Sequence, residues 1–383
     1  MNSAERHEKR YQRRKAARAA AKAAREKHSD SYDQVFSYGN LYRAYQQCRR
    51  NVSWKSSVQK YITQAPANVY KTWEKLQKGT YRSPAFFEFD IFERGKKRHI
   101  RSTIISERVV QKCLCENAII PRVAGSFIYD NGASAKGKGY DFAANRMMCH
   151  LQRHIRKNGS AGYILLCDFT SFFDSIMHWV VDRILHKRFS DLRLIGMAEE
   201  LIRQFDPDKP FEQRRGLGLG SQISQILAPA VADSIDRYIK DVLHIKGYGR
   251  YMDDFYLIHE SKHYLEHCKQ MIRDKCREIG LILSERKTQI VKLTHGFTWL
   301  KVRVFVKNTG KIIRKLHRSS VVRQRRRLKR LHGLFAKGII TLRDAWNCFQ
   351  SWRSHARRFC AYRTINEMEA LFARLFVGGK AAA

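Results

Sequence analysis

Two short apolar and aromatic stretches surround a pair of adjacent carboxylates, Asp253 and Asp254, in the segment 247–259. This pattern is typical of a strand, a tight turn and a second strand, with the acidic pair at the tip. Neighbouring side chains of a flat strand point to opposite faces, but a turn can bring them together. Two carboxylates at such a tip can hold divalent cations against phosphate oxygens if a third carboxylate arrives from elsewhere. The alternative is an acidic turn that only solvates the chain reversal.

Asp168 is the candidate for the third carboxylate. It is the last residue of the segment 163–168. The other residues of this segment are apolar on both faces, as expected of a buried central strand. A carboxylate at the end of a buried strand is costly unless it is paired or bound to a metal. Lys287 follows the acidic hairpin at a distance that allows it to fold back as a proton donor. A solvated lysine at the start of a strand is the alternative for Lys287.

The charge of the chain points to a polyanionic partner. Its 383 residues contain 74 Lys and Arg against 35 Asp and Glu, which gives a net charge of +39. A chain of this length can form two or three subdomains with a buried core. Such an excess opposes compaction unless a polyanion neutralises it, so a nucleic acid is the expected partner. A membrane is not expected, because no apolar run reaches the ~18 residues needed to span and no signal-peptide pattern is present.

The nine cysteines are an odd number and are scattered through the expected helices and strands. We interpret them as reduced core residues of a cytoplasmic protein. Cys113 and Cys115 form a lone C-x-C without a second pair at zinc-like spacing, which argues against a structural zinc.

A basic hairpin is predicted ahead of the buried strand. Residues 87–91 alternate between apolar and acidic, as a half-buried strand does, and Gly95 turns the chain into a second strand at 98–101. Arg98 and Arg101, with Lys97 in reserve, are candidates for gripping a triphosphate. A solvated basic strand explains them equally well.

Two glycine-rich segments are candidates for close approach to nucleic acid. Residues 132–139 are basic but lack P-loop spacing, and we interpret them as a contact to a nucleic-acid backbone. Residues 216–220 lead into a helix with small residues on one face, where Gln225 can hydrogen-bond a base or template. Close helix packing without a ligand is the alternative.

The rest of the chain is mostly helical in pattern. Segments 41–45 and 69–76 indicate amphipathic helices, and 297–305 indicates a strand. The strongly basic segment 318–337 is followed by two further amphipathic helices, at 342–355 and 363–375.

In order, these elements resemble a reverse transcriptase over roughly residues 40–375. The run Asp168–Asp174 is similar to the family's first catalytic motif, and Tyr251–Asp254 to its second. Lys287 matches the lysine that protonates pyrophosphate. Trp299, Leu300 and Lys301 stand where the family has its primer-grip hairpin. The family usually has Gly at the position of Lys301.

The resemblance implies an α+β right-hand polymerase with fingers, a palm built on an antiparallel sheet, and an α-helical thumb. It divides the chain into a basic N-terminal arm (1–36), fingers with N-terminal helices (37–160), a palm (161–306), a helical thumb (307–376) and a disordered tail (377–383). A fingers insertion is expected near 186–215.

The resemblance also implies RNA-directed DNA synthesis with two Mg²⁺ ions, which Mn²⁺ can replace. Metal ligands would be Asp168, Asp253 and Asp254, and Lys287 would be the proton donor. Phe173 would exclude a 2′-hydroxyl. The expected nucleotide-binding residues are Lys97, Arg98, Arg101, Phe169, Phe173 and Gln225. The expected primer and template contacts are Tyr251, Met252, Gly220, Ser224, Trp299, Leu300, Lys301, Arg323 and Arg326.

Within the family, the segment 220–225 fits the G-x-x-x-S-Q pattern of diversity-generating retroelements, and residues 313–327 and 351–355 look like that group's thumb. The loop version of group II intron enzymes and the Val-Thr-Gly thumb motif of retron enzymes are not seen. Gly218, where the group often has Pro, and the basic arm are departures. A related antiphage defence enzyme that makes cDNA from a non-coding RNA is therefore an alternative, and a non-catalytic RNA-binding protein is an alternative of another class.

The expected partners are an RNA template, a DNA primer or cDNA product, and deoxynucleoside triphosphates. An accessory protein or a structured non-coding RNA is also expected, without a membrane, and oligomer formation is left open. The expected setting is the cytoplasm of a bacterium, with the chain encoded by the bacterium or a phage.

Overall fold

The computed structural model describes residues 7–9, 11–17, 20, 28–93 and 96–377. In the predicted basic arm, the described residues before 21 are helical and exposed, and much of the rest of the arm lies outside the described residues. Nearly all of the tail predicted at 377–383 also lies outside them.

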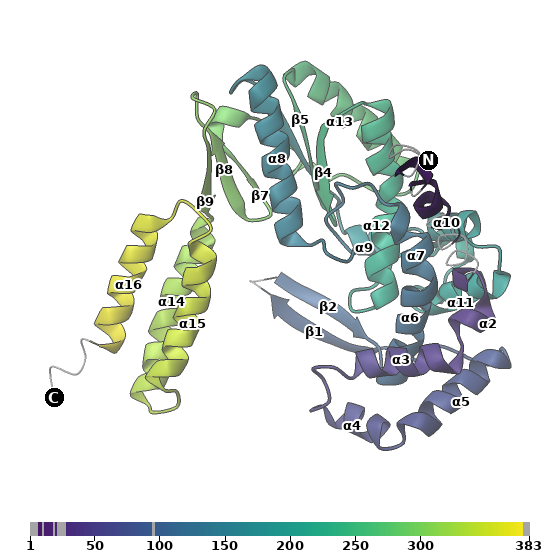
Figure 1. The fold of residues 1–383 in the computed structure, drawn as a ribbon. Helices are drawn as coiled ribbons and strands as arrows, with labels where there is room; N and C mark the ends of the chain where they lie inside the picture. The colour runs from purple at the N-terminus through teal and green to yellow at the C-terminus, as the bar shows by residue number, and fades with distance from the viewer. Residues whose placement is uncertain (1–6, 10, 18–19, 21–27, 94–95, 378–383) are drawn as a thin grey trace.

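A four-stranded antiparallel sheet lies at the centre of the fold (Figure 1). Its strand order is β4-β5-β3-β6, and its strands are β3 (Tyr163–Asp168), β4 (Gly247–Tyr251), β5 (Asp254–His259) and β6 (Gln289–Lys292). Five of the six residues of β3 are buried, which confirms the predicted central strand. The predicted acidic hairpin is also confirmed, because β4 and β5 pair directly around it.

Each face of this sheet packs against a different set of helices. On one face, Ile164 and Tyr256 belong to a core with Met147 and Leu151 of α8 (Tyr140–Asn158). The alternate residues of the same strands belong to a larger core that includes α12 (Gln222–Arg237) and α13 (Lys262–Arg277). Because both faces are covered, the ends of the strands are left as the accessible part of the sheet.

Helices make up most of the N-terminal half. Predicted amphipathic helices at 41–45 and 69–76 are confirmed within α3 (Tyr38–Cys48) and α5 (Ala65–Gln77). Further α-helices before the acidic hairpin are α2 (Tyr32–Val35), α4 (Ser56–Thr63), α6 (Ile105–Leu114), α7 (Ile120–Arg122), α9 (Phe172–Ser175), α10 (His178–Arg188) and α11 (Leu192–Arg203). None of the helices in the described part of the chain is long and apolar enough to cross a membrane.

The predicted basic hairpin forms from β1 (Phe87–Glu93) and β2 (Lys96–Ser102), which pair antiparallel. The expectation of a half-buried strand at 87–91 was wrong, since its apolar residues Phe87, Phe89 and Ile91 are 68 %, 40 % and 38 % exposed. Figure 1 shows the hairpin projecting away from the helical layers, which leaves its apolar side chains uncovered.

A second antiparallel sheet follows the central one, and it corrects the strand predicted at 297–305. The chain turns at Leu300 and Lys301, so that β7 (Phe297–Trp299) pairs with β8 (Val302–Val306), which in turn pairs with β9 (Ile312–Leu316). Both turn residues have positive φ, of 46° and 62°. A two-residue hairpin of this type is usually marked by Asn or Gly, and its absence here hides the turn.

Three C-terminal helices form a separate bundle at the end of the second sheet (Figure 1). They are α14 (Arg318–Ala336), α15 (Leu342–Ala356) and α16 (Tyr362–Phe376), in agreement with the predicted helices. Leu328, Phe349 and Phe372 contribute to the core of the bundle. The arginines of α14, including Arg323 and Arg326, stay exposed.

Candidate active site

The register of the central sheet brings the acidic residues to one end. Asp168 is the last residue of β3 and lies directly opposite Asp254, the first residue of β5. Opposed residues of antiparallel strands have Cβ atoms about 4.5–5.5 Å apart. Asp253 lies beside them in the turn, and its backbone oxygen accepts a hydrogen bond from the Phe169 N–H at 3.3 Å. Asp168, which is far from the acidic pair in the sequence, therefore meets Asp253 and Asp254 at one strand end.

The turn that carries Asp253 has a restrained backbone. Tyr251 pairs with Asp254, which leaves Met252 and Asp253 as a two-residue loop. Met252 has a φ of 55°, in the left-handed region that costs a residue with a side chain roughly 1–2 kcal/mol. The Arg250 guanidinium donates to the Met252 carbonyl at 3.0 Å. Such a backbone conformation persists only where its surroundings hold it.

Lys287 folds back onto the carboxylates. The Ser284 N–H donates to the Asp168 carbonyl at 2.8 Å, and the Lys287 N–H donates to the Ser284 carbonyl at 3.2 Å. This anchored turn places the Lys287 ammonium 2.6 Å from Asp168 Oδ1. The side chain remains 44 % exposed, so it can move without leaving a packed core.

The charges at this strand end are unbalanced. Burial, followed by the negative charges of Asp253 and Asp168, raises the pKa of Asp254 to about 7, and Lys287 opposes this shift. Clustered carboxylates are the oxygen donors that Mg²⁺ prefers, and a divalent cation would relieve their repulsion. Among the described residues, no three His, Cys, Asp or Glu side chains are already arranged to hold a metal ion. The donor chemistry fits Mg²⁺, and the side chains would have to converge to bind it.

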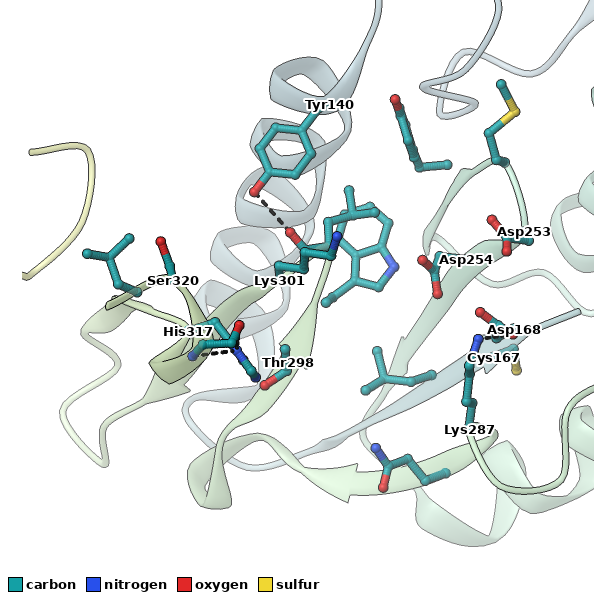
Figure 2. Close-up of a pocket in the computed structure, with 18 of the residues that line it drawn as sticks. Tyr140, Cys167, Asp168, Asp253, Asp254, Lys287, Thr298, Lys301, His317 and Ser320 are labelled. Carbon is teal, nitrogen blue, oxygen red and sulfur yellow. Dashed lines mark hydrogen bonds and ion pairs between the residues drawn. The ribbon is translucent and has the colours of Figure 1, made fainter. Parts of the chain in front are cut away.

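Two cavities open on either side of the carboxylates. The first, of about 830 Å³, is lined by Tyr251, Met252, Trp299, Leu300, Lys301 and Arg323 together with the acidic residues and Lys287. Figure 2 shows the carboxylates and Lys287 on one side of this cavity, with Lys301, His317 and Ser320 on the other. Tyr140 holds the 300–301 turn by donating to the Leu300 carbonyl at 3.0 Å. Arg326 is exposed on α14 and does not line this cavity.

The second cavity, of about 810 Å³, is lined by Lys97, Arg101, Phe169 and Phe173 as well as Asp168 and Asp253. In this conformation Lys97 pairs with Asp90 at 2.9 Å. Arg101 pairs with Glu88 at 3.0 Å and also donates to the Phe205 carbonyl. Both candidate triphosphate contacts therefore lie at the cavity with their charges matched by acids of β1.

Arg98 and His99 complete the basic strand. Arg98 belongs to β2, where its backbone pairs with Ile91, but its side chain lies outside the described part of the structure. His99 lines the cavity between Lys97 and Arg101 and contacts Glu88 and Asp90. His99 is not among the residues predicted from the sequence, although the two-residue period of a strand places it on the same face as Lys97 and Arg101.

Three predicted contacts around the second glycine-rich segment are not brought to either cavity. Ser224 is fully buried, and Gln225 is half-buried with its backbone carbonyl accepting from the Ser134 hydroxyl. A Cβ on Gly220 would lie 2.8 Å from the Arg101 carbonyl oxygen. In the described conformation Gly220 permits packing against β2 and Ser224 is buried, and the predicted contacts of these residues with nucleotide or template stay predictions.

The other glycine-rich segment is also structural. Lys138 donates to the carbonyls of Tyr129 and Asn131 at 2.7 and 3.0 Å, and Gly132 lies against Ala143 and Tyr251. Lys138 is thus used to fix the loop, whereas Lys136, the other lysine of the segment, is exposed, and the interpretation as a contact to a nucleic-acid backbone stays a prediction.

The antiparallel sheet that ends in three carboxylates, set between a basic hairpin and a helical bundle, defines a right-hand nucleic-acid polymerase of the α+β class. The chain belongs to the reverse transcriptase (RNA-dependent DNA polymerase) family, whose model matches residues 94–304. The family match indicates an RNA-directed DNA polymerase, which is a nucleotidyltransferase.

Solved structures of telomerases show a distant similarity. Telomerase from Candida albicans in complex with a TWJ fragment of telomeric RNA is 12 % identical with a TM-score of 0.49, over 84 % of this chain and 66 % of that chain. Apo telomerase from Candida tropicalis is 12 % identical with a TM-score of 0.46, over 76 % and 58 %. This chain thus spans less than two thirds of the length of either telomerase. A comparison with curated proteins found no match.

Proposed function

We propose that the chain copies a structured RNA template into cDNA at Asp168, Asp253 and Asp254, as part of a diversity-generating retroelement. The proposal rests mainly on one observation: Asp168 and Asp254 are cross-strand partners beside Asp253, and the neighbouring carboxylates help to raise the pKa of Asp254 to about 7. A site with this excess of negative charge is suited to bind divalent cations and phosphate together.

The three aspartates would hold two Mg²⁺ ions, with Mn²⁺ as a substitute. When bound, the ions lower the pKa of the primer 3′-hydroxyl and neutralise the triphosphate. Lys97 and Arg101 would release their acidic partners and grip the triphosphate, together with Arg98. Lys287 would deliver a proton to the departing pyrophosphate. Phe173, at the wall of the same cavity, would exclude a 2′-hydroxyl.

The cavity on the other side would receive the primer and template. Met252 and Tyr251 would face the primer terminus, where the flexible Met side chain can pack against the last nucleotide. Trp299, Leu300 and Lys301 would hold the primer from the turn between β7 and β8. Arg323, and more distantly Arg326, would follow the duplex backbone from α14. In this assignment residues 37–160, 161–306 and 307–376 are fingers, palm and thumb.

Primer extension on an RNA template with Mg²⁺ tests the assignment. Asp253→Asn should abolish incorporation, whereas Asp241→Asn, a change of an exposed carboxylate outside both cavities, should not. Unchanged incorporation by Asp253→Asn would refute the site.

The biological role is tested by the product. The G-x-x-x-S-Q pattern at 220–225 favours diversification, with a small accessory protein and a template-repeat RNA as partners. The basic arm and Gly218 depart from the pattern of that group and leave room for the alternative, an antiphage defence enzyme. Sequencing the cDNA bound to protein purified from its own bacterial cytoplasm separates them: substitutions directed to adenines indicate diversification, and a repetitive or non-coding product indicates defence.

A further inference from the structure

The helical layer formed by α3, α4 and α5 carries a dense positive charge. Residues 38–78 are all described, and their single acidic residue, Glu74, is paired with Lys78 at 2.8 Å. The same residues include eight Lys and Arg side chains, all of them exposed: Arg43, Arg49, Arg50, Lys55, Lys60, Lys71, Lys75 and Lys78. So many like charges on a small layer repel one another, which makes a polyanion the favoured partner.

Aromatic rings are exposed among these cations. Trp54 is 73 % exposed, Tyr70 51 % and Tyr38 37 %. The orientation of the Trp54 side chain is fixed by two contacts. Its indole N–H donates to the Asn51 carbonyl at 3.2 Å, and the Lys55 ammonium lies 5.4 Å from the ring centroid. A large ring held in place and open to solvent is a platform on which a nucleic-acid base can stack at little cost in side-chain entropy.

This layer lies outside the catalytic region. Leu41, Val58 and Val69 are buried on its inner side, and α3, α4 and α5 all contact α6. Figure 1 shows the three helices as an outer layer beyond β1 and β2, away from the central sheet. None of residues 38–78 lines either of the two cavities beside the carboxylates. The primer terminus and the incoming nucleotide therefore cannot be the occupants of this surface.

We propose that these eleven side chains, the α3–α5 surface, bind a single-stranded segment of the RNA template outside the catalytic cavities. The occupant follows from the combination of groups: cations neutralise phosphates, and rings stack on bases. A duplex offers its phosphates but keeps its bases stacked on one another, and a lipid surface has no bases to stack. This inference rests on the proposed function, since the RNA held here is the template to be copied.

The connection between α3 and α4 provides the test, because it holds Trp54 and three of the cations. We compare the wild-type protein with a variant carrying Trp54→Ala, Arg49→Gln, Arg50→Gln and Lys55→Gln. A control variant loses the same number of charges at exposed lysines elsewhere, through Lys187→Gln, Lys246→Gln and Lys292→Gln. Dissociation constants are measured over a range of salt concentrations for a short primer–template and for the same duplex with a long unpaired 5′ template extension.

The surface variant is expected to bind the extended template about tenfold or more weakly, since each stacked base and phosphate contact adds to affinity. The slope of log K against log[salt] should fall by about 2, from three lost phosphate contacts on a single strand. Incorporation on the short primer–template should not change. Trp54→Phe alone, which keeps a ring, should bind more tightly than Trp54→Ala alone, and this pair of variants separates stacking from charge.

Two outcomes overturn the proposal. An equal loss of affinity in the control variant would show that only the overall charge matters. Wild-type affinity of the surface variant for the extended template would assign the surface to another partner, such as an acidic accessory protein. Failure of the wild-type protein to extend the short primer–template would instead count against the proposed function, and the affinity comparison would still test the surface.

Discussion

The guanidinium of Arg250 and the carboxylate of Asp236 form a two-pronged ion pair in the interior, with N–O distances of 2.7 and 2.6 Å. Both side chains are at most 1 % exposed. The remaining guanidinium nitrogen donates to the carbonyl of Met252, within the acidic turn. Helix α12, which carries Asp236, is thus tied directly to the backbone that positions Asp253.

Removal of one member of this pair should destabilise the fold. Arg250→Met leaves the Asp236 charge buried without its partner, and we expect the free energy of unfolding to fall by about 3–5 kcal/mol. Urea denaturation measures this change. Arg277→Met serves as a control, because Arg277 and Asp274 form an exposed pair, and a surface pair contributes about 0–1 kcal/mol.

A second variant separates stability from positioning of the turn. Arg250→Met combined with Asp236→Leu and Tyr248→Phe makes the site apolar, the last change being needed because the Tyr248 hydroxyl donates to Asp236. An apolar replacement of a buried pair often restores stability. We expect nucleotide incorporation to stay slow, since nothing then holds the Met252 carbonyl. Full recovery of the rate along with stability would mean that Arg250 contributes only to folding.

His150 is expected to make stability depend on pH. It is 3 % exposed, its Nε2 accepts from Arg146 at 3.3 Å, and its Nδ1 lies 2.9 Å from the Tyr256 hydroxyl. Burial lowers the pKa of His150 to about 4, with Asp130 opposing the shift and Arg146, Lys240 and Arg153 adding to it. An imidazole in the unfolded chain has a pKa of about 6.5.

Between these two pKa values the unfolded chain binds the proton and the folded chain does not. Stability should therefore be lost as the pH falls from about 6.5 to about 4, by up to roughly 3 kcal/mol, and should not change on this account above pH 6.5. Urea denaturation across this range should show a flatter profile for His150→Gln than for the wild type. The exposed control His263→Gln should keep the wild-type profile. Identical profiles for all three proteins would contradict the prediction.

The parts of the fold that the sequence predicts are those in which one local pattern determines the structure. Residues 163–168 are apolar on both faces and become the buried strand β3, and residues 69–76 repeat with helical period and lie within α5. Asp168 could be proposed as a partner of the acidic pair because it ends a buried strand, and the family motifs support the same pairing. The cross-strand register that brings them together is a tertiary property.

The sequence is less informative where packing decides. Leu300 and Lys301 form a turn without the residues that normally mark one. Gly220 and Ser224 belong to a motif that suggests contact with nucleic acid, yet Gly220 packs on the Arg101 backbone and Ser224 is buried. A glycine or serine has the same appearance in a sequence whether its neighbour is a ligand or the protein itself.

Lys287 should act through its proton as well as its charge. Its ammonium lies 2.6 Å from Asp168 and is partly exposed, so it can reach a leaving group beside the carboxylates. We expect Lys287→Met to slow single-turnover incorporation about 10²-fold or more, in the range usual for general acids. Lys292→Met, at an exposed position of β6, is the control.

Lys287→Arg distinguishes the two contributions of that side chain. Arginine keeps the positive charge near Asp168 but does not release a proton in the accessible pH range. It should therefore remain slow, with a rate close to that of Lys287→Met. A rate equal to that of the wild type would show that only the charge at this position is needed.

Phe173 should control the choice between deoxyribonucleotides and ribonucleotides. Its ring packs edge-on against Phe172, with centroids 5.6 Å apart, and its carbonyl accepts from the Leu217 N–H at 2.8 Å, so the wall of the cavity is fixed on both sides. We expect Phe173→Ala to lower the preference for the deoxyribonucleotide by about tenfold or more, since the 2′-hydroxyl is then no longer rejected.

Phe173→Tyr, which keeps the ring, should retain the preference, and Phe211→Ala, at a half-exposed ring outside the cavity, should have no effect. Steady-state kcat/KM values for matched deoxy- and ribonucleoside triphosphates measure the preference, and a Phe173→Ala enzyme that discriminates as well as the wild type would remove Phe173 from this role.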